Sequence, residues 1–109
     1  MYEYNGTVEK IVDADTIDIR VDLGFGIGFK ERFRVLGIDA WEMKGTERAN
    51  GIKAKERVIE LIPVGSHVTI KTHKDQKGKY GRYLAEIFSD NGENIGEVLI
   101  KEGHAEKYL

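Results

Sequence analysis

Short stretches of alternating apolar and polar residues follow one another along the chain and predict β-strands. The first two cover residues 7–12 and 16–22. In the second stretch Ile17, Ile19 and Val21 recur with a period of two, which is typical of a strand with one buried face. We therefore expect these three side chains to face a core and the polar residues between them to face solvent.

The rest of the chain predicts three more strands and two helices. A helix is expected over residues 47–62, with Thr46 as a possible N-cap and Pro63 ending it. A shorter helix is expected at about 95–102, ended by Gly103 in the manner of a C-cap. The remaining strands are expected at 30–36, 67–72 and 83–88.

The segment between the second and third strands is rich in glycine and has two interpretations. Residues 23–29 read Leu-Gly-Phe-Gly-Ile-Gly-Phe, which invites comparison with a phosphate-binding loop. Such a loop leads into a helix and ends in Gly-Lys-Ser/Thr, and neither feature follows here. We therefore interpret the segment as a hairpin connection.

The predicted order of elements is three strands, a helix, two strands and a second helix. This order is typical of the OB-fold, a small barrel that often binds nucleic acids or sugars. The fold class predicted is mainly β with α, a five-stranded OB-fold barrel with two helices. At 109 residues, the chain has the usual length of one compact domain, and we expect residues 1–109 to form it.

The composition limits which metal ligands the chain can offer and where in the cell we expect it. The chain has no cysteine, so any metal must be held by oxygen or imidazole ligands. No apolar run approaches the length of a membrane span, and Met1 is followed by polar residues without the pattern of a signal peptide. We expect a soluble, cytoplasmic protein that acts as a monomer.

The net charge of −2 is unusual for a protein that binds nucleic acids. The charges are nevertheless segregated along the sequence. Residues 71–82 contain five basic side chains against Asp75 alone, and residues 83–106 contain six acidic side chains against Lys101. This distribution predicts one basic and one acidic face, although ordinary solvated charge would give the same pattern.

Three acidic side chains follow apolar segments that would lie side by side in a barrel. Asp15 and Asp39 could converge on one hard cation, for which two carboxylates and a backbone carbonyl form a suitable calcium site. Glu42 lies three residues beyond Asp39, close enough to orient or deprotonate a water molecule bound to the metal. We therefore expect a metal site with an adjacent general base.

Two arginines from distant segments complete the candidate chemistry. Arg34 and Arg82 can each bind phosphate oxygens through a planar guanidinium. Together with a metal ion they would stabilise the charge that develops during phosphodiester hydrolysis. Taken singly, each residue has an ordinary alternative role, such as a turn aspartate or a surface ion pair between Arg34 and Glu42.

Three segments together resemble the active-site segments of the staphylococcal nuclease (thermonuclease-like) family. They are residues 13–16 (Asp-Ala-Asp-Thr), residues 33–42 (Phe-Arg-Val-Leu-Gly-Ile-Asp-Ala-Trp-Glu) and residues 79–82 (Lys-Tyr-Gly-Arg). The resemblance extends from Thr7 to about Tyr108 and is close in order and spacing.

The resemblance implies a role for each matching position. By it, Asp15, Asp39 and the carbonyl of Ala40 are calcium ligands, and Glu42 is the general base. Arg34 and Arg82 are the phosphate-binding arginines. The positions expected to line the nucleotide pocket are Lys79, Tyr80 and Tyr108.

The family chemistry implies a calcium-dependent nuclease that leaves 3′-phosphate ends. We expect single-stranded or frayed DNA and RNA as substrates, because these reach a shallow site most easily. The chain departs from the family at Ala40-Trp41, where Thr-Pro is common, and at Ala14, which replaces a glycine. These departures and the acidic charge leave an alternative open, a non-catalytic OB-fold module that binds nucleic acid or a protein partner.

Overall fold

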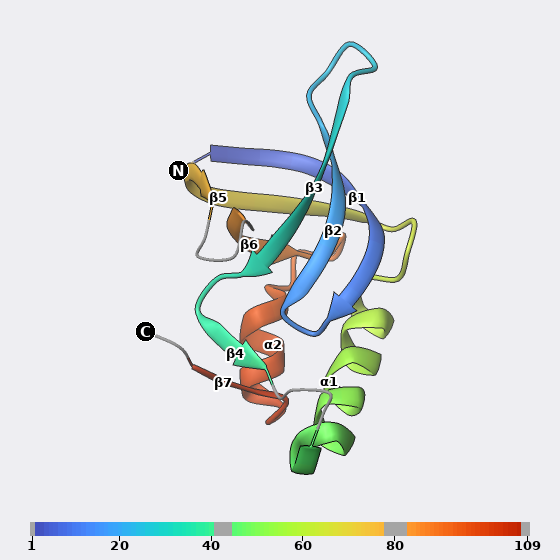
Figure 1. The fold of residues 1–109 in the computed structure, drawn as a ribbon. Helices are drawn as coiled ribbons and strands as arrows, with labels where there is room; N and C mark the ends of the chain where they lie inside the picture. Colours follow the sequence, from blue (N-terminus) through green and yellow to red (C-terminus); the bar gives the residue numbers. More distant parts are fainter. Residues whose placement is uncertain (1, 41–44, 78–82, 108–109) are drawn as a thin grey trace.

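The computed structural model contains a closed barrel of five strands, and it describes residues 2–40, 45–77 and 83–107. Within the barrel the strands run in the order β1-β2-β3-β6-β5. All neighbouring strands are antiparallel except β3 and β6, which are parallel. This is the predicted OB-fold barrel (Figure 1). The strands span Tyr2–Asp13 (β1), Thr16–Asp22 (β2), Gly28–Val35 (β3), His67–Lys77 (β5) and Tyr83–Phe88 (β6).

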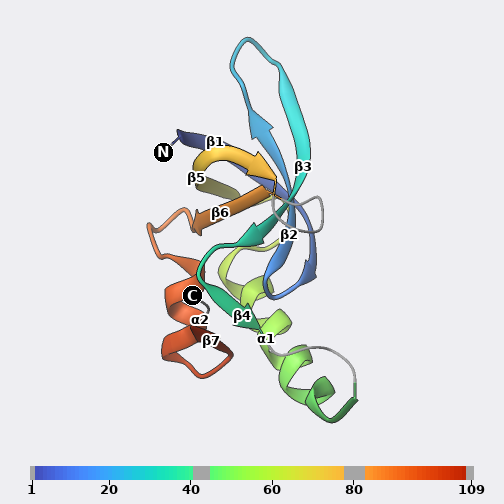
Figure 2. The same cartoon turned by 60° about the vertical axis from the view of Figure 1, so that its left-hand side comes forward.

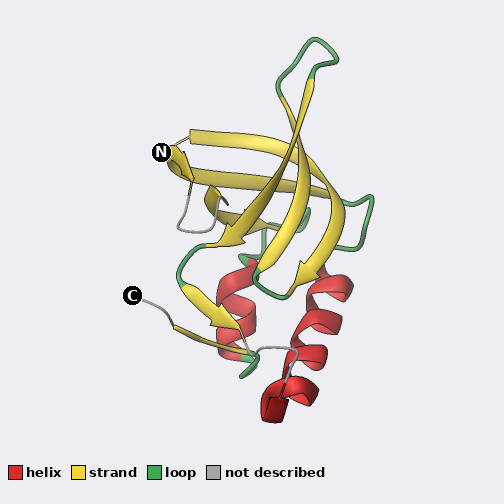
Figure 3. Cartoon of the chain, in the orientation of Figure 1, coloured by secondary structure: helices red, strands yellow, loops and turns green. Residues whose placement is uncertain are grey.

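Two α-helices pack beneath one end of the barrel, where Figures 1 and 3 place them side by side. Helix α1 spans Arg48–Leu61, after a 3-10 turn at Gly45–Glu47, and α2 spans Ile95–Lys101. Arg57 of α1 donates two hydrogen bonds to Glu102, of 2.7 and 3.1 Å, which tie the helices together. In the described part of the chain, neither helix is long and apolar enough to cross a membrane.

One core fills the barrel and continues between it and the helices. The alternating residues Ile17, Ile19 and Val21 all face this core, as the sequence predicts. Val58 of α1 and Leu99 of α2 cover the end of the barrel and are fully buried. The core therefore fixes the register of β2, and with it the position of the turn that precedes this strand.

Two sequence-based expectations for local structure are wrong. Thr16 and Asp18 were expected on a solvent-exposed face, yet they are 3% and 9% exposed. Asp18 is buried because the side chain of Arg32 reaches across from β3 and covers it. Thr46 is not the N-cap of α1, because the cap position is Glu47, whose side chain makes no capping hydrogen bond.

The structure also contains a small second sheet that the sequence analysis missed. Strand β4 (Ile38–Ala40) pairs antiparallel with β7 (Ala105–Lys107), outside the barrel. The two segments are more than sixty residues apart in the sequence and too short for a periodic signal. Their pairing fixes Asp39 opposite Glu106.

The glycine-rich connection between β2 and β3 is a hairpin, as expected. Leu23 N donates to Ile27 O and Ile27 N to Gly24 O, each at 2.9 Å. Gly24, Phe25 and Gly26 all have positive φ angles, which is why glycine recurs here. The hairpin projects beyond the barrel, on the side away from the helices (Figures 1 and 2).

Candidate active site

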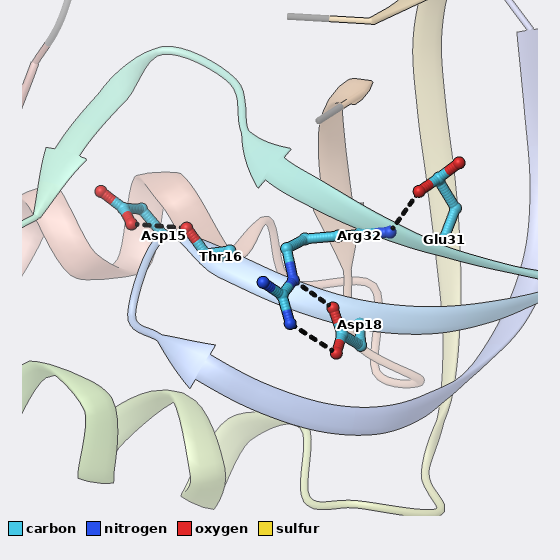
Figure 4. A network of polar contacts seen from close by, with 5 residues as sticks. All are labelled: Asp15, Thr16, Asp18, Glu31 and Arg32. Atoms are coloured by element: carbon cyan, nitrogen blue, oxygen red, sulfur yellow. Dashed lines mark hydrogen bonds and ion pairs between the residues drawn. The ribbon is translucent and has the colours of Figure 1, made fainter. Parts of the chain in front are cut away.

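Asp15 lies in the tight turn between β1 and β2, at the end of the barrel. Its backbone carbonyl accepts a hydrogen bond of 2.8 Å from Val35 N, which binds the turn to the end of β3. Its side chain is only 15% exposed, and Thr16 Oγ1 donates to Asp15 Oδ1 at 3.1 Å (Figure 4). The carboxylate is thus held in a fixed, largely buried position, which requires a cationic partner.

Arg34 supplies that cation and brings two predicted ligands together. In the register of the β2–β3 ladder, Arg34 is paired with Thr16, so its side chain lies beside the Asp15 turn. Arg34 Nη1 is 3.1 Å from Asp15 Oδ2, and Nη2 is 3.6 Å from Asp39 Oδ1. Two carboxylates from separate segments therefore share one positive charge.

The guanidinium of Arg34 is not fully satisfied by these contacts. Although Nη1 is close to Asp15, it is buried and makes no hydrogen bond of good geometry in the described structure. Arg34 and Asp15 thus attract each other as opposite charges at short distance, but no N–H of Nη1 points at an oxygen of that carboxylate. A buried, unpaired donor is costly unless water, an ion or a ligand completes it.

Asp39 reaches the site because the chain changes direction after β3. Gly37 has a φ of +83°, a left-handed conformation that a residue with a side chain adopts at a cost. The turn takes the chain out of the barrel into β4, and pairing with β7 holds Asp39 there. The Asp39 side chain is 63% exposed, so this carboxylate faces the solvent side of the site.

Ala40 approaches Asp15 through its backbone. Ala40 N donates to Asp15 Oδ2 at 3.3 Å. The predicted metal ligands Asp39 and Ala40 therefore lie beside Asp15, the predicted ligand from the β1–β2 turn. The oxygen donors and charges in this region suit a hard divalent cation. In the described residues, however, no group of three acidic or histidine side chains is close enough to hold a metal.

The predicted site residues thus fall into two groups. Asp15, Arg34, Asp39 and Ala40 lie together in the structure. The others were expected to provide the general base, a second phosphate-binding arginine and a nucleotide pocket, and their roles remain predictions. They lie outside the described residues: Glu42, Lys79, Tyr80, Arg82 and Tyr108.

Sequence reasoning missed two polar contacts beside this site. Thr16, which fixes the Asp15 carboxylate, could have been found because a threonine directly after a buried aspartate is placed to bond it. Asp18 and Arg32 form a two-point pair on the same face of β2 and β3, with distances of 2.7 and 3.2 Å (Figure 4). The hydrogen bonds from Arg32 lower the pKa of Asp18, so this carboxylate stays ionised.

Comparisons with known proteins identify the family of the chain. A model of the family described as "Staphylococcal nuclease homologue" matches residues 32–109. "Endonuclease YhcR" of Bacillus subtilis is 29% identical over 98% of this chain, and "Endonuclease YncB" of the same bacterium is 33% identical over 93%. "Uncharacterized protein MJ1439" of Methanocaldococcus jannaschii is 32% identical over 97%.

These relatives are longer proteins. The chain spans 9% of the length of YhcR, 46% of YncB and 60% of MJ1439. The likeness therefore concerns only one part of each relative, and the family model alone covers well over half of this chain. On this match, and on the barrel that the structure contains, the chain belongs to the staphylococcal nuclease homologue family.

Proposed function

We propose that this protein is a nuclease that hydrolyses phosphodiester bonds in DNA and RNA and requires calcium. The observation that carries the proposal is the meeting of Asp15 and Asp39 at the guanidinium of Arg34, which keeps a buried, unpaired donor. Such a group is suited to an anionic ligand beside a cation site. The names of the two Bacillus subtilis relatives, both endonucleases, support the same reaction.

The residues proposed to hold calcium are Asp15, Asp39 and the backbone carbonyl of Ala40. Their chemistry fits, because calcium prefers carboxylate and carbonyl oxygens and tolerates water in its remaining positions. The two carboxylates already surround one positive charge, that of Arg34. When bound, the metal would polarise the phosphate and help to stabilise the charge of the transition state.

Arg34 is proposed to bind the reacting phosphate. Its planar guanidinium can donate two parallel hydrogen bonds and keeps its charge at any relevant pH. In the present structure it lies against the two carboxylates and its Nη1 atom is buried, so binding of a phosphate would require the guanidinium to shift away from Asp15. Arg82 is proposed as the second phosphate ligand, on the strength of the family resemblance.

Glu42 is proposed as the general base that activates the attacking water, and Lys79, Tyr80 and Tyr108 as residues of the nucleotide pocket. Departure of the 5′ oxygen would leave 3′-phosphate ends, as the family chemistry implies. Single-stranded or frayed nucleic acid is the proposed substrate, because its phosphates are accessible to a site at the end of a barrel.

A second candidate is a non-catalytic module that binds nucleic acid or a protein. It is favoured by the way in which Arg34 is already engaged by Asp15 and Asp39, and by the net charge of −2. The two functions differ in a single outcome, cleavage.

The test is incubation of end-labelled single-stranded DNA and RNA with the protein, in calcium and in chelator. We expect cleavage only with calcium and 3′-phosphate ends on the products. Glu42→Gln should lower the rate about a hundredfold or more, the usual scale of general base catalysis. The matched control is Glu60→Gln, which changes an exposed glutamate of α1 and should leave the rate unchanged. Binding without cleavage at any calcium concentration would identify the non-catalytic module.

A further inference from the structure

The hairpin that joins β2 to β3 extends well beyond the barrel and has no role in the site described above. We refer to residues 20–30, which include its tip, as the hairpin arm. Figures 1 and 2 show its tip standing clear of the barrel in two views, while Arg20, Val21 and Asp22 at its base still pair with β1. In the described residues, β3 pairs with β6 only from Phe33 to Val35.

The two faces of the arm differ in chemistry. On one face, Val21 is paired with Phe29, and both belong to an apolar pocket of about 150 Å³ at the base of the arm. The pocket is rich in aromatic rings, and its volume suits one flat ring system and not a large ligand. Its walls are formed by Tyr4, Val21, Leu23, Phe29, Phe33, Thr72 and Tyr83.

Four large apolar side chains on the arm are exposed to solvent. Phe25 is fully exposed, and Leu23, Ile27 and Phe29 are 49%, 58% and 45% exposed. If a fully exposed side chain of this size offers about 200 Å², the four offer roughly 500 Å². This is a patch of the size that marks an interaction site, but it is smaller than the roughly 800 Å² that each partner buries in a stable protein complex.

The other face of the arm carries two cations, of which Lys30 is near enough to Asp18 to help lower the pKa of that carboxylate. Arg20 and Lys30 are directly opposite each other in the β2–β3 ladder, and both are exposed. The next pair toward the barrel, Asp18 and Arg32, is neutralised by its own hydrogen bonds. Like charges opposite each other destabilise a sheet, so Arg20 and Lys30 would be stabilised by an anion between them.

Glycine at position 28 makes room for the side chain of Arg20. A Cβ at Gly28 would collide with the guanidinium of Arg20, so the arginine side chain lies across the backbone of the opposite strand. Arg34 belongs to the same face of β3 and is four residues from Lys30. At about 3.4 Å per residue the separation along the strand is about 14 Å, which equals about four stacked nucleotides.

From these observations we propose that the hairpin arm is a binding site for single-stranded nucleic acid. One phosphate is held between Arg20 and Lys30, and a base stacks on Phe25 at the tip, while a phosphate farther along the same strand lies at Arg34. Exposed aromatic rings beside cations are the general means of binding single strands without regard to sequence. The proposal extends the proposed function, since it assumes that the ligand of Arg34 is a nucleic acid.

Binding is tested in chelator, so that the result does not depend on cleavage. The probe is a fluorescent twelve-residue oligothymidine. We expect Phe25→Ala to weaken its binding fivefold or more, the lower end of the range for loss of one base stack. Phe29→Ala, on the face of the arm opposite the two cations, should change binding by less than twofold. Val64→Ala, at an exposed apolar residue outside the arm, is the control.

Substitution of Lys30, one of the two opposed cations, gives a second and independent test, the salt dependence of binding. Lys30→Gln should weaken binding of the twelve-mer and lower the slope of log affinity against log salt by about 0.7, the value for one phosphate contact to a single strand. In the free protein the same change removes both the repulsion from Arg20 and the attraction to Asp18, so the melting temperature should change little. Lys53→Gln, an exposed lysine on α1, should leave the slope unchanged.

The outcomes separate the proposal from its alternatives. No weakening by Phe25→Ala, or equal weakening by Phe25→Ala and Phe29→Ala, would overturn the arm as a nucleic acid site. Self-association that Phe25→Ala abolishes, with affinity for the twelve-mer unchanged, would assign the arm to a second copy of the chain. If the twelve-mer binds as expected but is never cleaved in calcium, the proposal that the arm binds nucleic acid is supported and the nuclease proposal is refuted.

Discussion

Replacement of Arg34 tests whether one guanidinium holds the two carboxylates together. Arg34→Met keeps much of the length of the side chain and removes its charge. At 3.1 Å from Asp15, the attraction is about 5 kcal/mol for an effective dielectric constant of about 20. Most of this is offset by the desolvation of a pair whose side chains are 18% and 15% exposed.

The net loss of stability should be moderate. Asp15 keeps its hydrogen bonds from Thr16 Oγ1 and Ala40 N, so the variant does not leave a bare carboxylate. Asp39 is 63% exposed, and its ion pair contributes little because solvent screens it. We expect the free energy of unfolding in chelator to fall by about 1 to 2 kcal/mol, which corresponds to a melting temperature lower by about 5 to 10 °C.

Calcium should affect the variant in the opposite direction. Removal of a positive charge from beside two carboxylates favours any other cation there, so we expect calcium to bind about tenfold or more tightly to Arg34→Met. Differential scanning fluorimetry in chelator and over a calcium series measures both effects, since a ligand of the folded state raises its stability in proportion to its affinity. Arg48→Met, an exposed arginine of α1, is the control.

Two results would refute the reasoning. If the variant melts like the control in chelator, Asp15 does not depend on Arg34 for its charge balance. If the variant melts lower but also binds calcium more weakly, Arg34 organises the carboxylates instead of competing with a metal for them.

Three further predictions concern other parts of the chain. Asp39→Asn should leave the melting temperature in chelator nearly unchanged, because Asp39 is mostly exposed, while calorimetry should record weaker calcium binding; a marked loss of stability would assign Asp39 to the fold. Asp18→Asn should cost stability at pH 7 but not at pH 2: the lowered pKa of Asp18 stabilises the fold above about pH 4, and that gain is lost as the pH falls through the folded-state pKa. Equal losses at both pH values would contradict this. Gly103→Ala should cost about 1 kcal/mol in urea denaturation without a change in activity, because φ is +79° there.

Much of the fold could be predicted because its signals are local. The strand over residues 83–88 has the predicted bounds, and the helix expected at 47–62 forms at Arg48–Leu61. Helix α2 ends before Gly103, as expected. Gly103 N donates to Ile100 O and His104 N donates to Leu99 O, which are the hydrogen bonds of a Schellman motif. Each of these features depends on residues within one turn or one strand.

The rest depends on partners that are far away in the sequence. Asp18 is buried because Arg32 covers it from fourteen positions further along the chain, and no period in β2 contains that information. Asp39 is placed by the pairing of β4 with β7, three-residue strands that are separated in the sequence by α1, β5, β6 and α2. For the site itself, the order of the segments predicted that Asp15 and Asp39 would converge, and the family resemblance added Ala40 to them.

The hairpin arm shows the opposite case, in which a local pattern predicted the element but not its use. Glycine and apolar residues between two strands predicted a connection, yet not that Phe25 would be fully exposed. The same ribbon of β2 and β3 carries Asp15 and Arg34 at one end, where β6 also pairs with β3, and the arm at the other. An element paired on both sides opens less readily than one held by a single neighbour. The fold thus places the charges of the proposed site at the end of the ribbon that is paired on both sides, and the proposed stacking surface at the hairpin tip.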